Sequence, residues 1–207
     1  MSVTLVNHPL ILHKLASLRD KTTGSDKFRQ LLGELAVQIF LEASKEQKTI
    51  AVKVDTPFAE CSSEKVEQKF ALIPIMRAGI GMQESIQRFW PDCSVGHIGI
   101  YRDKFLNTTV EYFCKMPKEL DHSVAYVLDP VIATGTTAAA SVSRLYEMGA
   151  TEVKFLSIIA CEEGLALLAS QHPELKIFTV STTEQLSDNG YLTPGIGDVG
   201  ARYYNNQ

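Results

Sequence analysis

The sequence has few cysteines and no long hydrophobic run. Its 207 residues include four cysteines, none with C-x-x-C spacing, so reduced thiols of a cytosolic protein are expected. No stretch approaches the roughly 18 apolar residues that cross a bilayer. The N-terminus lacks the basic and apolar regions of a signal peptide. These absences predict a cytoplasmic protein with no membrane partner.

The sequence also lacks an excess of positive charge. The net charge is −4, and lysine and arginine form no runs, so a nucleic-acid partner is not expected. The five histidines form no H-E-x-x-H motif, and neither a G-x-S-x-G motif nor a P-loop lysine is present. A small polyanionic substrate remains compatible with this composition if a few placed cations and a metal ion bind it.

Strand and helix patterns alternate from about residue 70. The predicted elements are strands at 70–75, 95–101, 124–128, 153–160 and 177–180, and helices at 82–89, 137–148 and 164–170. This alternation predicts an α/β fold with a mostly parallel central sheet and helices on both faces. Ligands bind such sheets beyond the carboxyl ends of the strands.

We expect one domain over residues 1–207. It comprises an N-terminal helical pair at about 9–44, a core at about 70–186 and a C-terminal loop region at about 187–207. Asn7 and Ser25 are the expected N-caps of the two N-terminal helices. Residues 102–123 form a polar connection with a β-ribbon near 110–113, and whether this segment is a lid stays open.

A strand, an acid, a Thr- and Gly-rich turn and a helix follow one another in residues 124–140. The strand delivers Asp129 at its end, where a carboxylate can hold a metal or a sugar diol. The turn from Ala133 to Thr137 leads into a helix, whose N-terminal N–H groups and dipole favour an anion. Helix capping alone is the simpler explanation of Thr-Gly-Thr-Thr. The ordered set favours a site for a phosphorylated sugar.

Two further strand ends carry arginine. Arg77 follows the strand 70–75 and precedes Gly79 and Gly81, which we expect to permit close approach by a ligand. Arg102 follows the strand 95–101. Either guanidinium can hold a diphosphate through paired hydrogen bonds. The alternative is a surface salt bridge for Arg77 and a solvated charge cluster for Arg102.

The C-terminal region contains a G-x-G-x-x-G pattern at 195–200 that does not predict a dinucleotide site. Such a fingerprint needs a βαβ unit, and only seven residues follow Gly200. We instead interpret the segment as a glycine-shaped loop that offers backbone groups to a planar polar ligand, with Asp198 beside it.

Together these motifs resemble the uracil phosphoribosyltransferase family of type I phosphoribosyltransferases. The resemblance covers nearly the whole chain and rests on five segments, namely Asn7 to Leu10, Pro74 to Gly79, Gly99 to Asp103, Leu128 to Gly135 and Pro194 to Asp198. It implies the type I phosphoribosyltransferase fold. The implied reaction converts uracil and 5-phosphoribosyl 1-diphosphate to UMP and diphosphate in pyrimidine salvage, with Mg²⁺.

The resemblance also implies residue roles. The donor would be bound by Arg77, Arg102, Asp129, Pro130, Val131, Ile132, Ala133, Thr134, Gly135, Thr136, Thr137 and Asp198. Uracil would be bound by Leu192, Gly197, Asp198 and Val199, mainly through the backbone. Asp129, Asp198 and Arg102 would be the catalytic residues. Mg²⁺ would be held mainly by substrate and water near Asp129 and Asp198, with no direct protein ligand expected.

Some positions depart from the family pattern and keep alternatives open. Thr136 replaces a glycine and Ala201 replaces a common acidic residue. One alternative is a non-catalytic relative that senses UMP or the donor, and another is a phosphoribosyltransferase for a different base. The family resemblance also implies a homo-oligomer, at least a dimer, and leaves open whether GTP binds as an effector.

Overall fold

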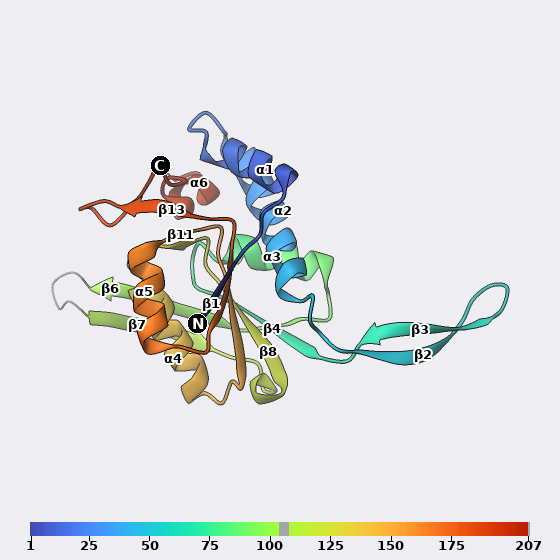
Figure 1. Cartoon of the computed structure of the whole chain (residues 1–207). Coiled ribbons are helices and arrows are strands. Elements are labelled where there is room, and N and C mark those ends of the chain that lie inside the picture. Colours follow the sequence, from blue (N-terminus) through green and yellow to red (C-terminus); the bar gives the residue numbers. More distant parts are fainter. Residues whose placement is uncertain (104–107, 207) are drawn as a thin grey trace.

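Six parallel strands form the central sheet of the protein, a computed structural model that describes residues 1–103 and 108–206 (Figure 1). In spatial order they are β1 (Ser2–Leu5), β12 (Lys176–Thr179), β10 (Glu152–Leu156), β8 (Ser123–Leu128), β4 (Lys69–Pro74) and β5 (Ser94–Val95). Every neighbouring pair in this order is parallel. The carboxyl ends of the strands therefore meet at one edge, as the predicted α/β fold requires.

Helices cover both faces because alternate strand residues face opposite sides. In β8, Val124, Tyr126 and Leu128 belong to one apolar core and Ala125 and Val127 to the other. The first core lies under α1 (Pro9–Arg19), α2 (Ser25–Ala43) and α3 (Ile80–Phe89). The second lies under α4 (Thr136–Glu147) and α5 (Glu162–Gln171). The prediction of helices on both faces is confirmed.

A second, four-stranded sheet extends the central one beyond its carboxyl edge. Its order is β14 (Leu192–Thr193), β13 (Ser181–Leu186), β11 (Ile159–Cys161) and β9 (Val131–Ile132). Three of these strands follow a central strand after a short break, β9 after β8, β11 after β10 and β13 after β12. The predicted strand at 153–160 is thus two strands, because Ser157 and Ile158 pair with Phe178 and Pro130 at the crossing between the sheets.

Two antiparallel hairpins complete the structure. One joins β6 (His97–Asp103) to β7 (Thr108–Lys115), so the predicted ribbon near 110–113 is confirmed. The other, β2 (Thr49–Asp55) with β3 (Glu60–Val66), was not predicted and projects from the body of the molecule in Figure 1. A short 3-10 turn spans Leu120–His122. No helix in the described part of the chain has the length and apolar character to cross a membrane.

The N-terminal helices occur as predicted, but both expected caps are displaced by one residue. His8, not Asn7, caps α1, because its Nδ1 accepts a hydrogen bond from the N–H of Leu10 at 3.2 Å. Gly24, not Ser25, is the N-cap of α2. The Ser25 hydroxyl instead donates to Asn205 Oδ1 at 3.0 Å. The local sequence pattern around Ser25 could not predict this hydrogen bond, because Asn205 lies 180 positions away.

Candidate active site

Asp129 follows β8 at the carboxyl edge of the central sheet. It is partly buried, and its Oδ1 accepts a hydrogen bond from the N–H of Val131 at 3.3 Å. Burial raises the pKa of this carboxyl to about 7, and the hydrogen bond from Val131 opposes the rise only in part. Within the described residues no cationic side chain pairs with it. The carboxylate therefore favours a cation or a donor group supplied by a ligand.

The turn between β9 and α4 offers free N–H groups. Gly135 is the N-cap of α4 and has φ of 77°, with no side-chain cap. The N–H groups of Thr134, Gly135 and Thr137 have no hydrogen-bond partner in the described part of the chain. These unpaired donors and the N-terminus of a 12-residue helix favour a phosphate group. We call residues 133–137 the phosphate loop.

The phosphate loop rests directly on the start of α5. A Cβ atom at Gly164 would lie 2.2 Å from the carbonyl oxygen of Ala133, and one at Gly135 would lie 2.5 Å from the carbonyl oxygen of Gly164. The buried thiol of Cys161 also donates to the Ala133 carbonyl, at 2.9 Å. These supporting contacts were not predicted from the sequence, because Gly164 lies in an ordinary helical pattern about 30 positions from the loop.

Arg77 faces the same cavity as Asp129 and the phosphate loop. The cavity has a volume of about 200 Å³. It is lined by Ile75, Met76, Arg77, Ala78, Ile100, Asp129, Val131, Ile132, Ala133, Thr134, Gly135, Thr137 and Ala138. Eight of the predicted donor-binding residues thus surround one space, although they come from segments about 50 positions apart in the chain.

Protein atoms, not a ligand, explain the two glycines after Arg77. A Cβ atom at Gly79 would lie 2.2 Å from the carbonyl oxygen of Leu128, and one at Gly81 would lie 2.4 Å from the ring of Tyr203. The expected close approach by a ligand is therefore wrong at both positions. Gly79 instead lets the Arg77 turn pack against the end of β8.

Three predicted donor-binding residues lie away from this cavity, namely Pro130, Thr136 and Asp198, which is described with the C-terminal loop below. Pro130 is buried, and its carbonyl accepts from the N–H groups of Ile158 and Ile159 at the crossing between the sheets. Thr136 faces a separate hollow beside Thr108, with its Oγ1 2.9 Å from the hydroxyl of Thr134. The threonine at this position, where the family commonly has glycine, therefore does not occupy the cavity beside Asp129.

Arg102 pairs through its backbone with Thr109 in the β6–β7 hairpin. Its side chain lies outside the described residues, so its predicted contact with diphosphate stays a prediction.

The predicted uracil-binding residues form a neighbouring loop that does not line the cavity. The side chains of Leu192 and Val199 are buried in the core under α1, α2 and α3. Asp198 is exposed and caps α6 (Val199–Tyr204), because its Oδ1 accepts from the N–H of Ala201 at 2.9 Å. Gly197 adopts φ of 73° beside Asp198. We call residues 192–198 the base loop. At Leu192, and at Val199 directly after the loop, only backbone groups remain available to a ligand.

A buried ion pair holds the base loop. Glu184, whose side chain is fully buried, accepts from the N–H of Gly195 at 3.0 Å and pairs with Arg19, which also donates to the carbonyl of Gly195. Burial disfavours the charge of Glu184, yet the hydrogen bonds from Arg19, Gly195 and Ser181 outweigh it and lower the pKa of the carboxyl. The local pattern contains no signal for this partnership, because 165 positions separate the two charged residues.

Arg202 fixes the other side of the same loop. Its buried guanidinium donates to the carbonyls of Ile196 and Leu18, at 2.9 and 2.7 Å. These contacts occupy the inner carbonyls of the base loop. The N–H groups of Gly197 and Asp198 have no hydrogen-bond partner in the part of the chain that the structure describes. The loop therefore presents free donors on a backbone that the buried Arg202 and the partly buried Arg19 hold in place.

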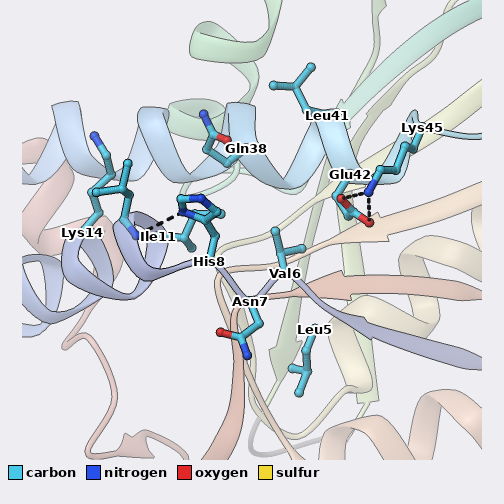
Figure 2. Close-up of a pocket in the computed structure, with 11 residues that line it drawn as sticks. Leu5, Val6, Asn7, His8, Ile11, Lys14, Gln38, Leu41, Glu42 and Lys45 are labelled. Carbon is cyan, nitrogen blue, oxygen red and sulfur yellow. Dashed lines mark hydrogen bonds and ion pairs between the residues drawn. The ribbon is translucent and has the colours of Figure 1, made fainter.

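A larger hollow lies away from these residues. Figure 2 shows it between the N-terminal segment and α2, with a volume of about 520 Å³. Its lining includes Asn7 and His8 of the first segment that carried the family resemblance, and Lys45 paired with Glu42. None of the residues with a predicted site role lines it. The His8 imidazole caps α1 there, which gives this part of the resemblance a structural explanation.

The model of the uracil phosphoribosyltransferase family matches residues 5–206 of the chain. This chain belongs to that family. It is 42% identical over 205 residues to a uracil phosphoribosyltransferase of Thermus thermophilus and covers 99% of that protein. It is 41% identical over 203 residues to one of Finegoldia magna and covers 97% of it. The resemblance found in the motifs is therefore confirmed over nearly the whole length.

Solved structures agree with the fold of the family. A protein from Aquifex aeolicus has a TM-score of 0.93 and 30% identity, with 100% of this chain and 99% of that one covered. An adenine phosphoribosyltransferase from Thermoanaerobacter pseudethanolicus has a TM-score of 0.51 at 10% identity, with 76% and 84% covered. This second likeness shows the shared type I phosphoribosyltransferase fold alone.

Gly164→Ala is expected to weaken UMP binding at least tenfold, because the new methyl group would displace the carbonyl of Ala133 and with it the phosphate loop. Gly24→Ala is the matched control, since a Cβ atom at Gly24 meets nothing within 4 Å. Calorimetric titration of both variants with UMP measures the effect. Equal affinity for UMP in the two variants would show that the close approach to α5 does not determine the conformation of the phosphate loop.

Proposed function

We propose that this protein converts uracil and 5-phosphoribosyl 1-diphosphate to UMP and diphosphate, as a pyrimidine-salvage enzyme. The observation that carries the proposal is the single cavity shared by Arg77, Asp129 and the phosphate loop. It combines an anion site, an acid and a cation at the carboxyl edge of the sheet, in a chain of the uracil phosphoribosyltransferase family.

The donor fits the cavity from its phosphate end. In this arrangement the 5-phosphate accepts hydrogen bonds from the N–H groups of Thr134, Gly135 and Thr137. Asp129 then holds the ribose hydroxyls, and the guanidinium of Arg77 holds the diphosphate. Departure of diphosphate leaves positive charge on the ribose ring, so orientation and charge neutralisation supply most of the catalysis. Pro130 and Ala133 provide no second loop acid, so we assign no loop carboxylate as a base on uracil.

Asp129 also fits a role beside Mg²⁺. Mg²⁺ usually keeps several waters and binds through one or two carboxylates together with substrate phosphates. Asp129 is a carboxyl with a raised pKa and no paired cation within the described residues, so a divalent ion would favour its charged form. Bound Mg²⁺ would neutralise the diphosphate. No group of three or more His, Cys, Asp or Glu side chains that suits a metal occurs in residues 1–103 and 108–206, and Mg²⁺ would rely mainly on substrate and water.

The base loop supports selection of uracil. Uracil presents an acceptor, a donor and an acceptor along one edge, and the free N–H groups of Gly197 and Asp198 match an acceptor. Cytosine replaces one acceptor with a donor. A buried polar group left without a partner costs about 1–3 kcal/mol, which is enough to disfavour the wrong base. Asp198 would face the donor from the start of α6, by way of Mg²⁺ or water.

The first experiment measures nucleotide formation from 5-phosphoribosyl 1-diphosphate and uracil, cytosine, hypoxanthine or orotate, each with and without Mg²⁺. We expect turnover with uracil alone, and only with Mg²⁺. Turnover with another base and not with uracil would indicate a phosphoribosyltransferase for that base. Binding of UMP or the donor without any turnover would indicate the non-catalytic sensor instead.

Asp129→Asn is expected to lower turnover at least tenfold, because an amide cannot supply the negative charge. The carboxyl ionises near pH 3.8 when unfolded and near pH 7 when folded. Between these pH values Asp129 is protonated in the folded state and ionised in the unfolded state. Its contribution to the free energy of unfolding is therefore lost as the pH rises through 7. If 5-phosphoribosyl 1-diphosphate binds only to the ionised carboxylate, its binding near pH 6 must cause Asp129 to release a proton.

Calorimetry of donor binding at pH 6 in buffers of different ionisation enthalpy measures that proton release. Asp129→Asn provides the baseline for protons that the donor itself exchanges. The parent should release up to one proton more than the variant. Equal release by both proteins, or parental turnover in the variant, would contradict the assigned role.

We also propose that the protein assembles as at least a dimer. The supporting observation is the β2–β3 hairpin, which projects from the body and leaves Ile50 and Phe58 exposed, Phe58 at 99% (Figure 1). A lone two-stranded hairpin is marginally stable in water, so a covering surface would stabilise it. Light scattering after size-exclusion chromatography should give at least twice the chain mass of 22.9 kDa. A single-chain mass at micromolar concentration would refute assembly.

A further inference from the structure

The last helix, α6, is anchored firmly to the body of the protein. Next to the base loop, Arg202 donates to carbonyls of the N-terminal segment. Further along, the hydroxyl of Tyr203 donates to Glu84 Oε2 of α3 at 3.0 Å, and the ring of Tyr203 lies in the space that Gly81 leaves free. Arg29 of α2 donates to the carbonyl of Tyr203 at 2.8 Å. The residue after Tyr203 is therefore held in a defined place.

That residue, Tyr204, contacts Arg77 in two ways. The Arg77 guanidinium carbon lies 5.4 Å from the centre of the Tyr204 ring, within range of a cation–π interaction. The Tyr204 hydroxyl donates to the backbone carbonyl of Arg77 at 3.2 Å. One side chain thus holds both the main chain and the charged group of Arg77. The two residues lie 127 positions apart, and Tyr204 does not line the cavity.

Arg77 needs such a support. It is exposed, and it forms no ion pair with an acidic side chain in the part of the chain that the structure describes. An arginine side chain on a loop has many rotamers, and holding it in one of them costs entropy when a ligand binds. The Tyr204 ring against the guanidinium restricts the Arg77 side chain and so reduces this entropic cost.

We propose that Tyr204 is a positioning residue that orients Arg77 for the diphosphate of the donor. The proposal rests on the proposed function, which assigns the diphosphate to Arg77. Because Asp198 of the base loop caps α6 and Tyr204 ends it, one helix connects the proposed uracil site with the proposed diphosphate site. We assign Tyr204 to donor binding and not to base binding, because both of these contacts are to Arg77.

The test is steady-state kinetics of Tyr204→Leu and Tyr204→Phe with uracil and the donor varied separately. Leucine keeps an apolar side chain on α6 but removes the ring, so the KM for the donor should rise about three- to tenfold. The KM for uracil and kcat should stay within about twofold. Phenylalanine keeps the ring and should hold the donor KM within about twofold of the parent, which is rescue by the conservative variant.

Tyr146→Leu is the matched control, because Tyr146 near the C-terminal end of α4 has the same exposed fraction, 38%, and its ring lies against His172, which has no predicted site role. Its donor KM should be that of the parent. The positioning role is overturned if Tyr204→Leu leaves the donor KM unchanged, if the KM for uracil rises in proportion, or if Tyr204→Phe is as impaired as Tyr204→Leu. Proportional loss would indicate that Tyr204 only supports the fold of α6.

Arg77→Ala separates this inference from the function on which it rests. If Arg77→Ala leaves the donor KM unchanged, the assignment of diphosphate to Arg77 fails. If Arg77→Ala raises the donor KM and Tyr204→Leu does not, only the positioning role fails. The double variant should bind the donor no more weakly than Arg77→Ala, because Tyr204 has nothing left to orient. Additive effects in that cycle would contradict action through Arg77.

Discussion

The close contact between the phosphate loop and α5 is the constraint on which the site depends. Gly135 and Gly164 bring two backbones together with no side chain between them. At this contact Gly135 turns with φ of 77°, and the N–H groups of Thr134, Gly135 and Thr137 have no partner in the described part of the chain. Without this contact, the free donors at the start of α4 would have no defined position relative to Asp129, and the cavity would lose one wall.

Charge is used sparingly around that cavity. Among the described residues, Asp129 and Arg77 are the charged side chains that line it, and neither forms an ion pair. Asp129 has a raised pKa, and Arg77 is exposed. Arg19 and Glu184, by contrast, neutralise each other, and both hydrogen-bond to Gly195 of the base loop. Internally paired charge thus supports the shape of the site, and unpaired charge is left for the substrate.

Local patterns predicted the parts of the molecule that are contiguous in sequence. Apolar periodicity predicted the parallel sheet and its flanking helices. The residue types from Asp129 to Thr137 predicted an acid and an anion-binding turn at the end of a strand. The β2–β3 hairpin was missed although Ile50, Val52 and Val54 alternate in β2, because its partner β3 is exposed and mostly polar and shows no matching apolar pattern. Gly164, Glu184 and Tyr204 were missed for a different reason. Each acts on a partner distant in sequence, and only the folded chain brings the two together.

The four-stranded sheet gives the site a fixed scale. Its outer strands are β9, which leads into the phosphate loop, and β14, which begins the base loop. Three strand spacings separate them, about 14 Å at roughly 4.8 Å per spacing. Main-chain hydrogen bonds set this separation, so substitutions of side chains leave it unchanged. The sheet therefore fixes the distance between the start of the phosphate loop and the start of the base loop.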